Sequence, residues 1–235
     1  MGVIDELLMG GTTLEVAAFV WFVFSWVGYT YFSEYQSSRK RCLSNTLHRH
    51  REIWMKNMMT HDNRVADVAL IANLERSVSF FASTSLIVIA GALTLIGSLD
   101  RLQNLPVDVM QNQQAWGIKL VILIGIFIYA FFKFTWSLRQ YGFASVMIGS
   151  APNSYDSKED RQAFGKEAAM VISRAAHAYN LGLRSYYFAL AFLVWFVSGL
   201  GFITSTAIVV WVLYRREFKS RVLKALSRSK GISLP

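Results

Sequence analysis

Four long stretches of almost unbroken apolar residues lie along the chain, at 14–32, 78–98, 117–136 and 187–214. A bilayer core requires roughly 20 mostly apolar residues for one helical span, so each stretch is long enough to cross a membrane. The pattern predicts an all-α, polytopic integral membrane protein with about four transmembrane helices. The sequence contains no internal repeat and no low-complexity block, and we therefore expect one membrane domain over residues 1–235.

The polar segments between these stretches also carry helical signals. Residues 46–77 contain neither Gly nor Pro, so a helix is expected to lead almost continuously into the second span, with Asp62 and Asn63 as its capping break. Residues 150–157, SAPNSYDS, are turn formers and predict a linker before a second long helix. The helical cytoplasmic extensions are therefore expected at 33–77 and 137–186.

Composition and charge fit a membrane protein. Of the 235 residues 54% are hydrophobic and 17% are charged, whereas soluble domains carry about 25% charged residues. The net charge of +9 is attributed to cytoplasmic loops, which are rich in Lys and Arg in multi-pass proteins. No base-reading motif accompanies this charge, so no nucleic acid is expected as a partner. We expect a multi-pass protein of a bacterial inner (plasma) membrane.

The last apolar stretch allows two threadings. Its 28 residues span about 42 Å as a helix, enough for one tilted crossing and too little for two full ones. Alternatively, it dips in as a re-entrant hairpin that turns at Ser198-Gly199-Leu200-Gly201, which requires neighbouring helices to satisfy its backbone. The charge count favours the hairpin, because, of the Lys and Arg outside the apolar stretches, it puts twenty-one on the inside and one outside. On length, we favour the single crossing and leave the side of the tail open.

The basic tail at 215–235 is the second place where two interpretations compete. It places Phe218, Val222, Ala225 and Leu226 at helical spacing opposite basic residues. This spacing suits an amphipathic helix on anionic lipid headgroups. A solvated, frayed tail fits the same residues equally well.

Candidate chemistry is sparse. Cys42 is the only cysteine, and His48 and Glu52 share a helical face without a third ligand, so neither a metal nor a cofactor is expected. No hydrolase, zinc-protease or phosphate-loop motif is present, so we assign no catalytic residue. A lipid enzyme with His177 as its base would lack a second catalytic group in register.

Two sets of polar residues, each on one face of a predicted helix, extend to the edge of an apolar stretch and form the candidate site; we call them polar stripes. One stripe contains Asn73, Arg76, Phe80 and Ser83, and the other contains His177, Asn180, Arg184 and Tyr187. Charged groups near a membrane must pair, snorkel or face water. We therefore expect the stripes to meet, with Asp67 or Asp62 as the counter-charge of the arginines. A structural polar clamp is favoured over a ligand site.

The residues around these stripes resemble a known family. The motifs of the first half are Arg51-x-x-Trp54, Met58-Met59, Asp62-Asn63, Leu74-x-Arg76-Ser77 and Ala82-Ser83-Thr84-Ser85. The motifs of the second half are Asn180-Leu181-Gly182-Leu183-Arg184-x-x-Tyr187-x-Ala189-Leu190 and Leu193-x-Trp195-x-x-x-Gly199. Over about residues 10–216 the chain is similar to the family called domain of unknown function 599. The resemblance implies a polytopic membrane protein with about four apolar segments and implies no activity.

Two functional hypotheses follow. The middle of every apolar segment lacks Asp, Glu and Arg, which is unlike ion-coupled transporters. We therefore favour an accessory or scaffolding subunit of a membrane complex. The alternative is a small oligomeric channel or transporter for an anionic solute, with Arg76, Asn180 and Arg184 lining its entrance. Four short spans seldom enclose a path alone, so a homo-oligomer or a larger membrane complex is expected in either case.

Overall fold

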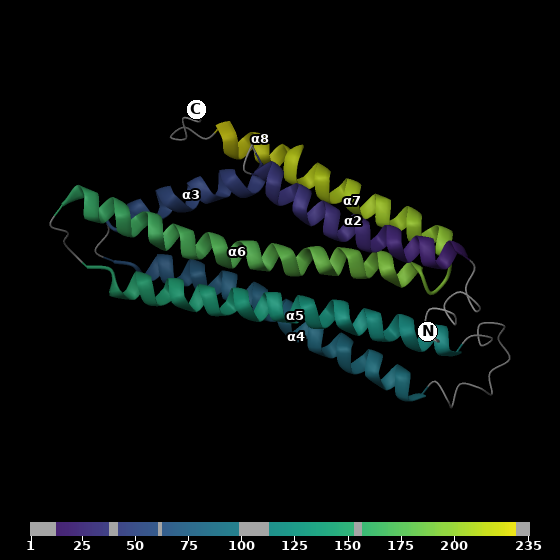
Figure 1. Ribbon diagram of the computed structural model, residues 1–235. Coiled ribbons are helices and arrows are strands. Elements are labelled where there is room, and N and C mark those ends of the chain that lie inside the picture. Colours follow the sequence, from purple (N-terminus) through teal and green to yellow (C-terminus); the bar gives the residue numbers. More distant parts are fainter. Residues whose placement is uncertain (1–12, 38–41, 61–62, 99–112, 153–156, 229–235) are drawn as a thin grey trace.

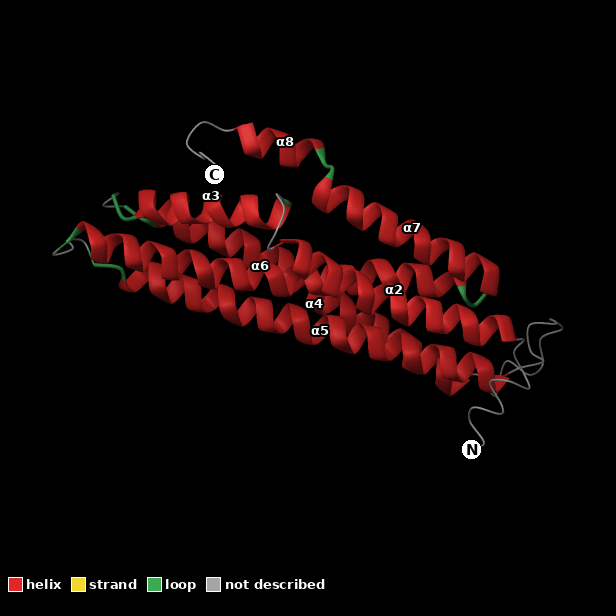
Figure 2. Ribbon diagram, turned by 45° about the horizontal axis from the view of Figure 1, so that its top comes forward, coloured by secondary structure: helices red, strands yellow, loops and turns green. Residues whose placement is uncertain are grey.

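The computed structural model describes residues 13–37, 42–60, 63–98, 113–152 and 157–228, and all regular structure in these ranges is helical (Figures 1 and 2). The helices are α2 (Thr13–Ser37), α3 (Leu43–Met58), α4 (Val65–Ser98), α5 (Gln113–Ser150), α6 (Lys158–Val194), α7 (Gly199–Phe218) and α8 (Arg221–Arg228). The all-α prediction is confirmed.

The helices form an elongated bundle around α6 (Figure 1). Antiparallel α5 and α6 pack along one another, and α4 packs on α5. At one end of the bundle α7 packs on α6 and α2 packs on α7, and at the other end α3 packs on α6. The chain therefore has an end built from α2, α7 and halves of the long helices, and an end built from α3 and their other halves.

Three helices are long and apolar enough to cross a membrane, among the residues that the structure describes: Thr13–Gln36, Val65–Ser98 and Ala115–Ser150. They contain the first three predicted apolar stretches. In α4 and α5 the helix continues well beyond the apolar stretch. These features are those of a membrane-embedded protein.

The fourth apolar stretch is not one straight helix, so the favoured single-helix interpretation of 187–214 is wrong. The helix α6 ends at Val194, and α7 begins at Gly199 and returns beside it. Ser198 caps α7 with extended backbone, at φ −158° and ψ 131°, and its hydroxyl accepts a hydrogen bond from the Gly201 amide at 3.2 Å. Length alone misled the prediction, because 28 apolar residues also suffice for two short arms when a serine cap interrupts them.

Close packing holds the two arms together. Phe202 of α7 stacks on Trp195 with ring centroids 5.0 Å apart, and the Ser205 hydroxyl donates to the Ala191 carbonyl at 3.2 Å. A Cβ at Gly201 would lie 2.9 Å from a Val194 methyl group, so glycine permits this approach. Lipid tails are as apolar as these side chains, so such close packing and interhelical hydrogen bonds stabilise the hairpin.

A polar cluster at the hairpin turn ties it to two other helices. The indole of Trp195 donates to the Glu15 carboxylate at 2.6 Å, and the Lys119 ammonium lies 3.1 Å from the same carboxylate oxygen. Lys119 also donates to the Trp195 carbonyl at 3.1 Å. Lys119 therefore joins α5 to α2 and to the hairpin turn.

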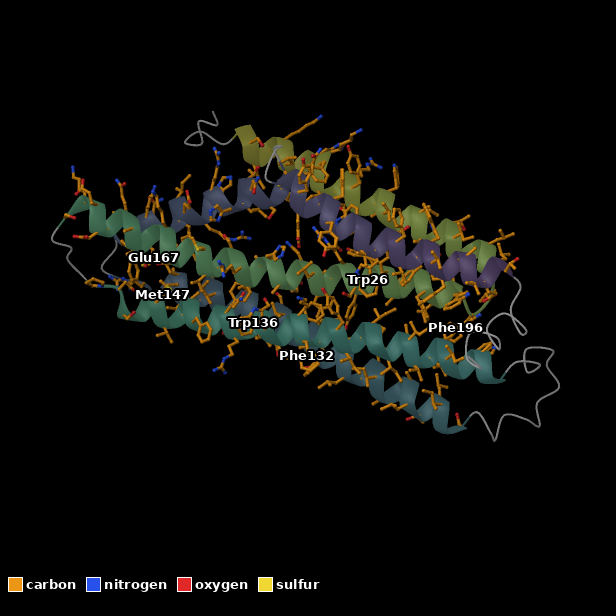
Figure 3. The ribbon with its side chains drawn as sticks, viewed as in Figure 1. Trp26, Phe132, Trp136, Met147, Glu167 and Phe196 are labelled. Atoms are coloured by element: carbon orange, nitrogen blue, oxygen red, sulfur yellow. The ribbon has the colours of Figure 1, made fainter. Side chains whose placement is uncertain are left out.

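Two aromatic and aliphatic cores follow the bundle. At the hairpin end Trp26 of α2 stacks on Phe188 of α6 with centroids 5.6 Å apart (Figure 3). At the α3 end the core is built from Met55, Met58, Ile71, Phe134, Ile148 and Ile172, all fully buried. On the outer face of α5, Phe132 and Trp136 remain exposed, where lipid would contact them.

The predicted breaks also appear. Between α3 and α4 the Asn63 side chain accepts a hydrogen bond from the Val65 amide at 2.9 Å and so caps α4, while Asp62 lies outside the described residues. The tail is helical as α8, but a break at Lys219 and Ser220 leaves Phe218 in α7. Leu223 of α8 is buried, and α8 packs on α3.

Candidate functional site

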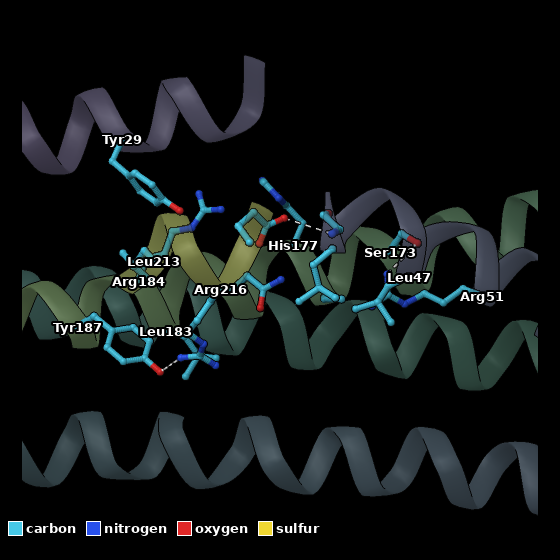
Figure 4. A pocket seen from close by; sticks show the side chains of 15 residues that line it. Tyr29, Leu47, Arg51, Ser173, His177, Leu183, Arg184, Tyr187, Leu213 and Arg216 are labelled. Carbon is cyan, nitrogen blue, oxygen red and sulfur yellow. Dashed lines mark hydrogen bonds between the residues drawn. The ribbon is translucent and has the colours of Figure 1, made fainter. Parts of the chain in front are cut away.

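All four ionisable or polar residues of the α6 stripe line one cavity. His177, Asn180, Arg184 and Tyr187 share a face of α6, and the cavity beside them has a volume of about 140 Å³ (Figure 4). The rest of the lining comes from α2, α3, α6 and α7: Tyr29, Leu43, Ser44, Leu47, Arg51, Ser173, Ala176, Leu183, Leu213, Arg216 and Glu217. The hairpin is what brings α7 to this cavity.

Arg184 is only partly satisfied. One terminal nitrogen, Nη2, donates to the Ser33 hydroxyl at 2.7 Å, and the guanidinium lies 5.4 Å from the centre of the Tyr29 ring. The other, Nη1, is buried and has no hydrogen-bond partner among the described residues. A buried donor without a partner is costly, because it loses water and gains nothing in return. An acceptor bound beside this nitrogen would remove that cost.

The end of α7 supplies a second arginine and the carboxylate of the lining. Arg216 donates to the Tyr187 hydroxyl and lies over its ring, with 5.3 Å to the ring centre. Glu217 accepts a hydrogen bond from the Ser44 amide at 3.2 Å, which satisfies a free amide at the start of α3. These contacts fix α7 to both α6 and α3.

A third arginine approaches from α3. Arg51 donates to the Ser173 hydroxyl at 3.4 Å, and His48 Nδ1 lies 2.8 Å from the same oxygen. Burial lowers the pKa of the Arg51 guanidinium, and nearby Tyr141 partly offsets that shift. A bound anion would compensate the lost hydration of this charge.

His177 lies at the more exposed side of the cavity, 3.6 Å from a carboxylate oxygen of Glu34. Burial lowers the pKa of His177; Glu34 raises it, and Arg184 and Lys133 lower it further. The lowered pKa favours the neutral imidazole, for which the contact with Glu34 is a polar contact rather than an ion pair.

The α4 stripe lies elsewhere, so the expectation that the two stripes meet is not met. Asn73, Arg76 and Ser83 are exposed on α4. Arg76 and Ser83 line a separate groove against Leu138 of α5. The reason is the helix packing: α6 turns its stripe towards α2, α3 and α7, whereas α4 approaches α6 through Phe81.

Asp67 is not the counter-charge of Arg184. It is buried, and its carboxylate accepts a hydrogen bond from the Trp54 indole at 2.6 Å, which joins α4 to α3. Asp62 lies outside the described residues.

The site residues that sequence reasoning missed are Arg51, Arg216, Glu217 and Ser33. Arg216 had a signal, because it directly follows an apolar stretch, but only the hairpin places it beside Arg184.

Within the described residues, no group of three or more His, Cys, Asp or Glu side chains is arranged to hold a metal ion. The cavity instead gathers three guanidinium groups around one carboxylate, which is the chemistry of an anion site.

Comparison with known protein families matches residues 17–222 to the family described as "Protein of unknown function, DUF599". No curated protein and no solved structure is significantly similar to the chain.

Proposed function

Since this chain belongs to the DUF599 family, whose description supplies no activity, we propose from its surfaces that it is an accessory or scaffolding subunit of a membrane complex. We propose further that a second copy of the chain covers α4. The observation that carries this is the exposure of α4: 17% of its most apolar stretch is buried, against 28% for α2 and for α5.

The outward side of α4 suits close contact with another helix. Its groove has a volume of about 630 Å³ and is lined by the small residues Ala72, Ser79 and Ser83, together with Glu75, Arg76, Phe80 and Leu138. Small residues allow two helix backbones to approach closely in a membrane. The three small residues therefore leave room for a neighbouring helix on this face of α4.

The charges in this groove favour a second copy as the partner. Neither Glu75 nor Arg76 forms an ion pair among the described residues. All copies have the same orientation in a membrane, so a two-fold axis along the membrane normal places equal residue numbers at equal depth. Glu75 and Arg76 are adjacent in the chain and so lie about 100° apart around the helix axis, one on each side of the groove. Across the two-fold axis, Glu75 of one copy therefore faces Arg76 of the second copy, and Arg76 of the first faces Glu75 of the second.

Disulfide trapping tests the α4 contact. In a Cys42→Ser background, Ser79→Cys should form cross-linked dimers in native membranes under mild oxidation. The matched control is Ser77→Cys, also exposed on α4 at nearly the same depth, but about 160° around the helix axis. Equal cross-linking of the two variants would contradict a specific α4 contact.

Native mass spectrometry of the solubilised complex then identifies the partner. Two or more copies of the chain support the proposal, and an additional stoichiometric protein names the complex it serves. A monomer with only lipid, or a foreign protein with a single copy of this chain, would overturn the second copy as the occupant of α4.

The second candidate function is a small oligomeric channel or transporter for an anionic solute. The observation in its favour is the basic cavity with Arg51, Arg184 and Arg216. Flux of an anionic solute in proteoliposomes that is lost in Arg184→Ala and Arg216→Ala would support it, and flux that is equal in both variants and the parent would contradict it.

The orientation is also a proposal. The N-terminal end of α2, the C-terminal end of α4 and the hairpin turn would lie on the outer side of a bacterial inner (plasma) membrane. The basic segments and the tail would lie together in the cytoplasm, in agreement with twenty-one Lys and Arg against one.

A further inference from the structure

A second hollow adjoins the basic cavity. An apolar groove of about 530 Å³ runs between α2 and α7, lined among others by Trp21, Phe24, Gly28, Val210 and Trp211. Tyr29 lines both this groove and the basic cavity. A polar, cationic hollow and a long apolar one therefore meet at a single side chain.

We propose that the basic cavity binds the phosphate group of an anionic phospholipid, with one acyl chain lying in the groove between α2 and α7. The proposal rests on these two hollows and does not depend on the association through α4.

The cavity holds unused donors for phosphate oxygens. Nη1 of Arg184 is buried without a partner. Arg216 uses one nitrogen on Tyr187, so its guanidinium keeps further N–H groups. Arginine binds phosphate through paired, charge-assisted hydrogen bonds, which are stronger than bonds between neutral groups.

The lining charge selects a headgroup with net negative charge. Three arginines surround one carboxylate, and that carboxylate, Glu217, already accepts the Ser44 amide. The ammonium of a zwitterionic headgroup would meet a cavity of its own sign. A phospholipid without a cationic group avoids that repulsion.

The depth of the cavity matches a lipid headgroup. Arg184 precedes the apolar part of α6, Arg216 follows that of α7, and Tyr29 lies near the end of the α2 span. All three therefore lie at the basic end of the membrane helices. The aromatic ring of Trp211 lies exposed in the groove, as aromatic side chains do at the boundary between acyl chains and headgroups.

A free phosphate ion would bind the same arginines as a lipid phosphate. Only a variant in the groove between α2 and α7 therefore distinguishes a bound lipid from a free ion. Gly28 offers a clean variant, because a Cβ at this position meets no atom within 4 Å. The Cβ of Gly28→Leu would therefore meet open space, and the rest of the side chain would occupy part of the groove. It should weaken binding of a lipid and leave binding of inorganic phosphate unchanged.

Native mass spectrometry of the full-length chain in detergent measures the binding. The probes are dioleoyl phosphatidylglycerol, dioleoyl phosphatidylcholine and inorganic phosphate. Arg216→Gln should weaken phosphatidylglycerol binding about tenfold, as expected for one lost charge-assisted contact. The matched control is Arg215→Gln, whose guanidinium lies over Trp211 and does not line the cavity, and it should stay within about twofold.

Each outcome decides the proposal. A preference for phosphatidylglycerol over phosphatidylcholine that is lost in Arg216→Gln and Gly28→Leu, and kept in Arg215→Gln, supports it. Equal loss in both arginine variants would show non-specific attraction and overturn the site. Binding of inorganic phosphate that depends on Arg216, together with lipid binding that Gly28→Leu leaves intact, would assign the cavity to a free anion and overturn the lipid.

Discussion

Gly182 shows how one position determines the distance between two helices. A Cβ at this residue would lie 2.5 Å from Phe134 Cε1. The Phe134 ring is fully buried and cannot retreat, because Phe81 stacks on it at 5.6 Å and Tyr186 meets its edge at 5.6 Å. The contact between α5 and α6 therefore requires glycine here.

We expect Gly182→Ala to lower the free energy of unfolding by about 1–3 kcal/mol, the usual cost of overpacking a tight core. Gly125→Ala is the matched control on α5, since a Cβ there meets nothing within 4 Å. Unfolding in mixed micelles with increasing SDS measures both. A Gly182→Ala protein as stable as the control would contradict the role of this contact.

At the scale of an element, specific side-chain contacts also hold the hairpin formed by α6 and α7 in place. Its turn is short, and Glu15 and Lys119 hold it from α2 and α5. The side chains of Lys119 and Glu15 are 14% and 27% exposed, so their ion pair is partly shielded from water. Water therefore screens its attraction less than that of a surface pair, and removal of one partner alone leaves the other charge partly desolvated.

A double-mutant cycle of Glu15→Gln and Lys119→Met should give a coupling energy of about 1–2 kcal/mol in the free energy of unfolding. The comparison cycle pairs Glu15→Gln with Lys133→Met, because Lys133 lies over Tyr129, on a later part of α5. That cycle should be additive within about 0.5 kcal/mol. Additivity in both cycles would mean that the cluster does not stabilise the turn.

At the scale of the whole molecule, the hairpin accounts for both the length of the last apolar stretch and the distribution of Lys and Arg along the chain. Because α7 returns to the end of the bundle where α3 lies, the basic tail joins the two basic segments. The charge count that argued for a hairpin thus agrees with the arrangement of the helices. Length argued against it only on the assumption of one continuous helix.

Cysteine labelling tests the resulting orientation. In a Cys42→Ser background, which keeps a capping side chain at the start of α3, Lys224→Cys should react with an impermeant thiol reagent only after the membrane is opened. Val197→Cys, 88% exposed on the hairpin turn, should react in intact cells. Labelling of both variants from the same side would contradict the proposed threading.

Much of the fold was predictable because it depends on local patterns. Apolar stretches of bilayer length predicted the helices, and the capping residue Asn63 marked the start of α4. Family motifs predicted the family, which is confirmed. The α6 stripe was predictable as a shared face, since helical phase alone places His177, Asn180, Arg184 and Tyr187 together.

The partners of that stripe were not predictable, because they depend on which helix packs where. Arg76 and Arg184 have the same chemistry and similar distances from their apolar stretches, yet they lie in different hollows.

The sequence by itself thus determined composition, helical periodicity and the positions of most helix ends, all of which are set by neighbours within a few residues. Only the tertiary structure decided that the last apolar stretch folds back and that Arg216 joins Arg184. Those outcomes depend on contacts such as Trp195 with Glu15, which lie far apart in the chain and have no local signal.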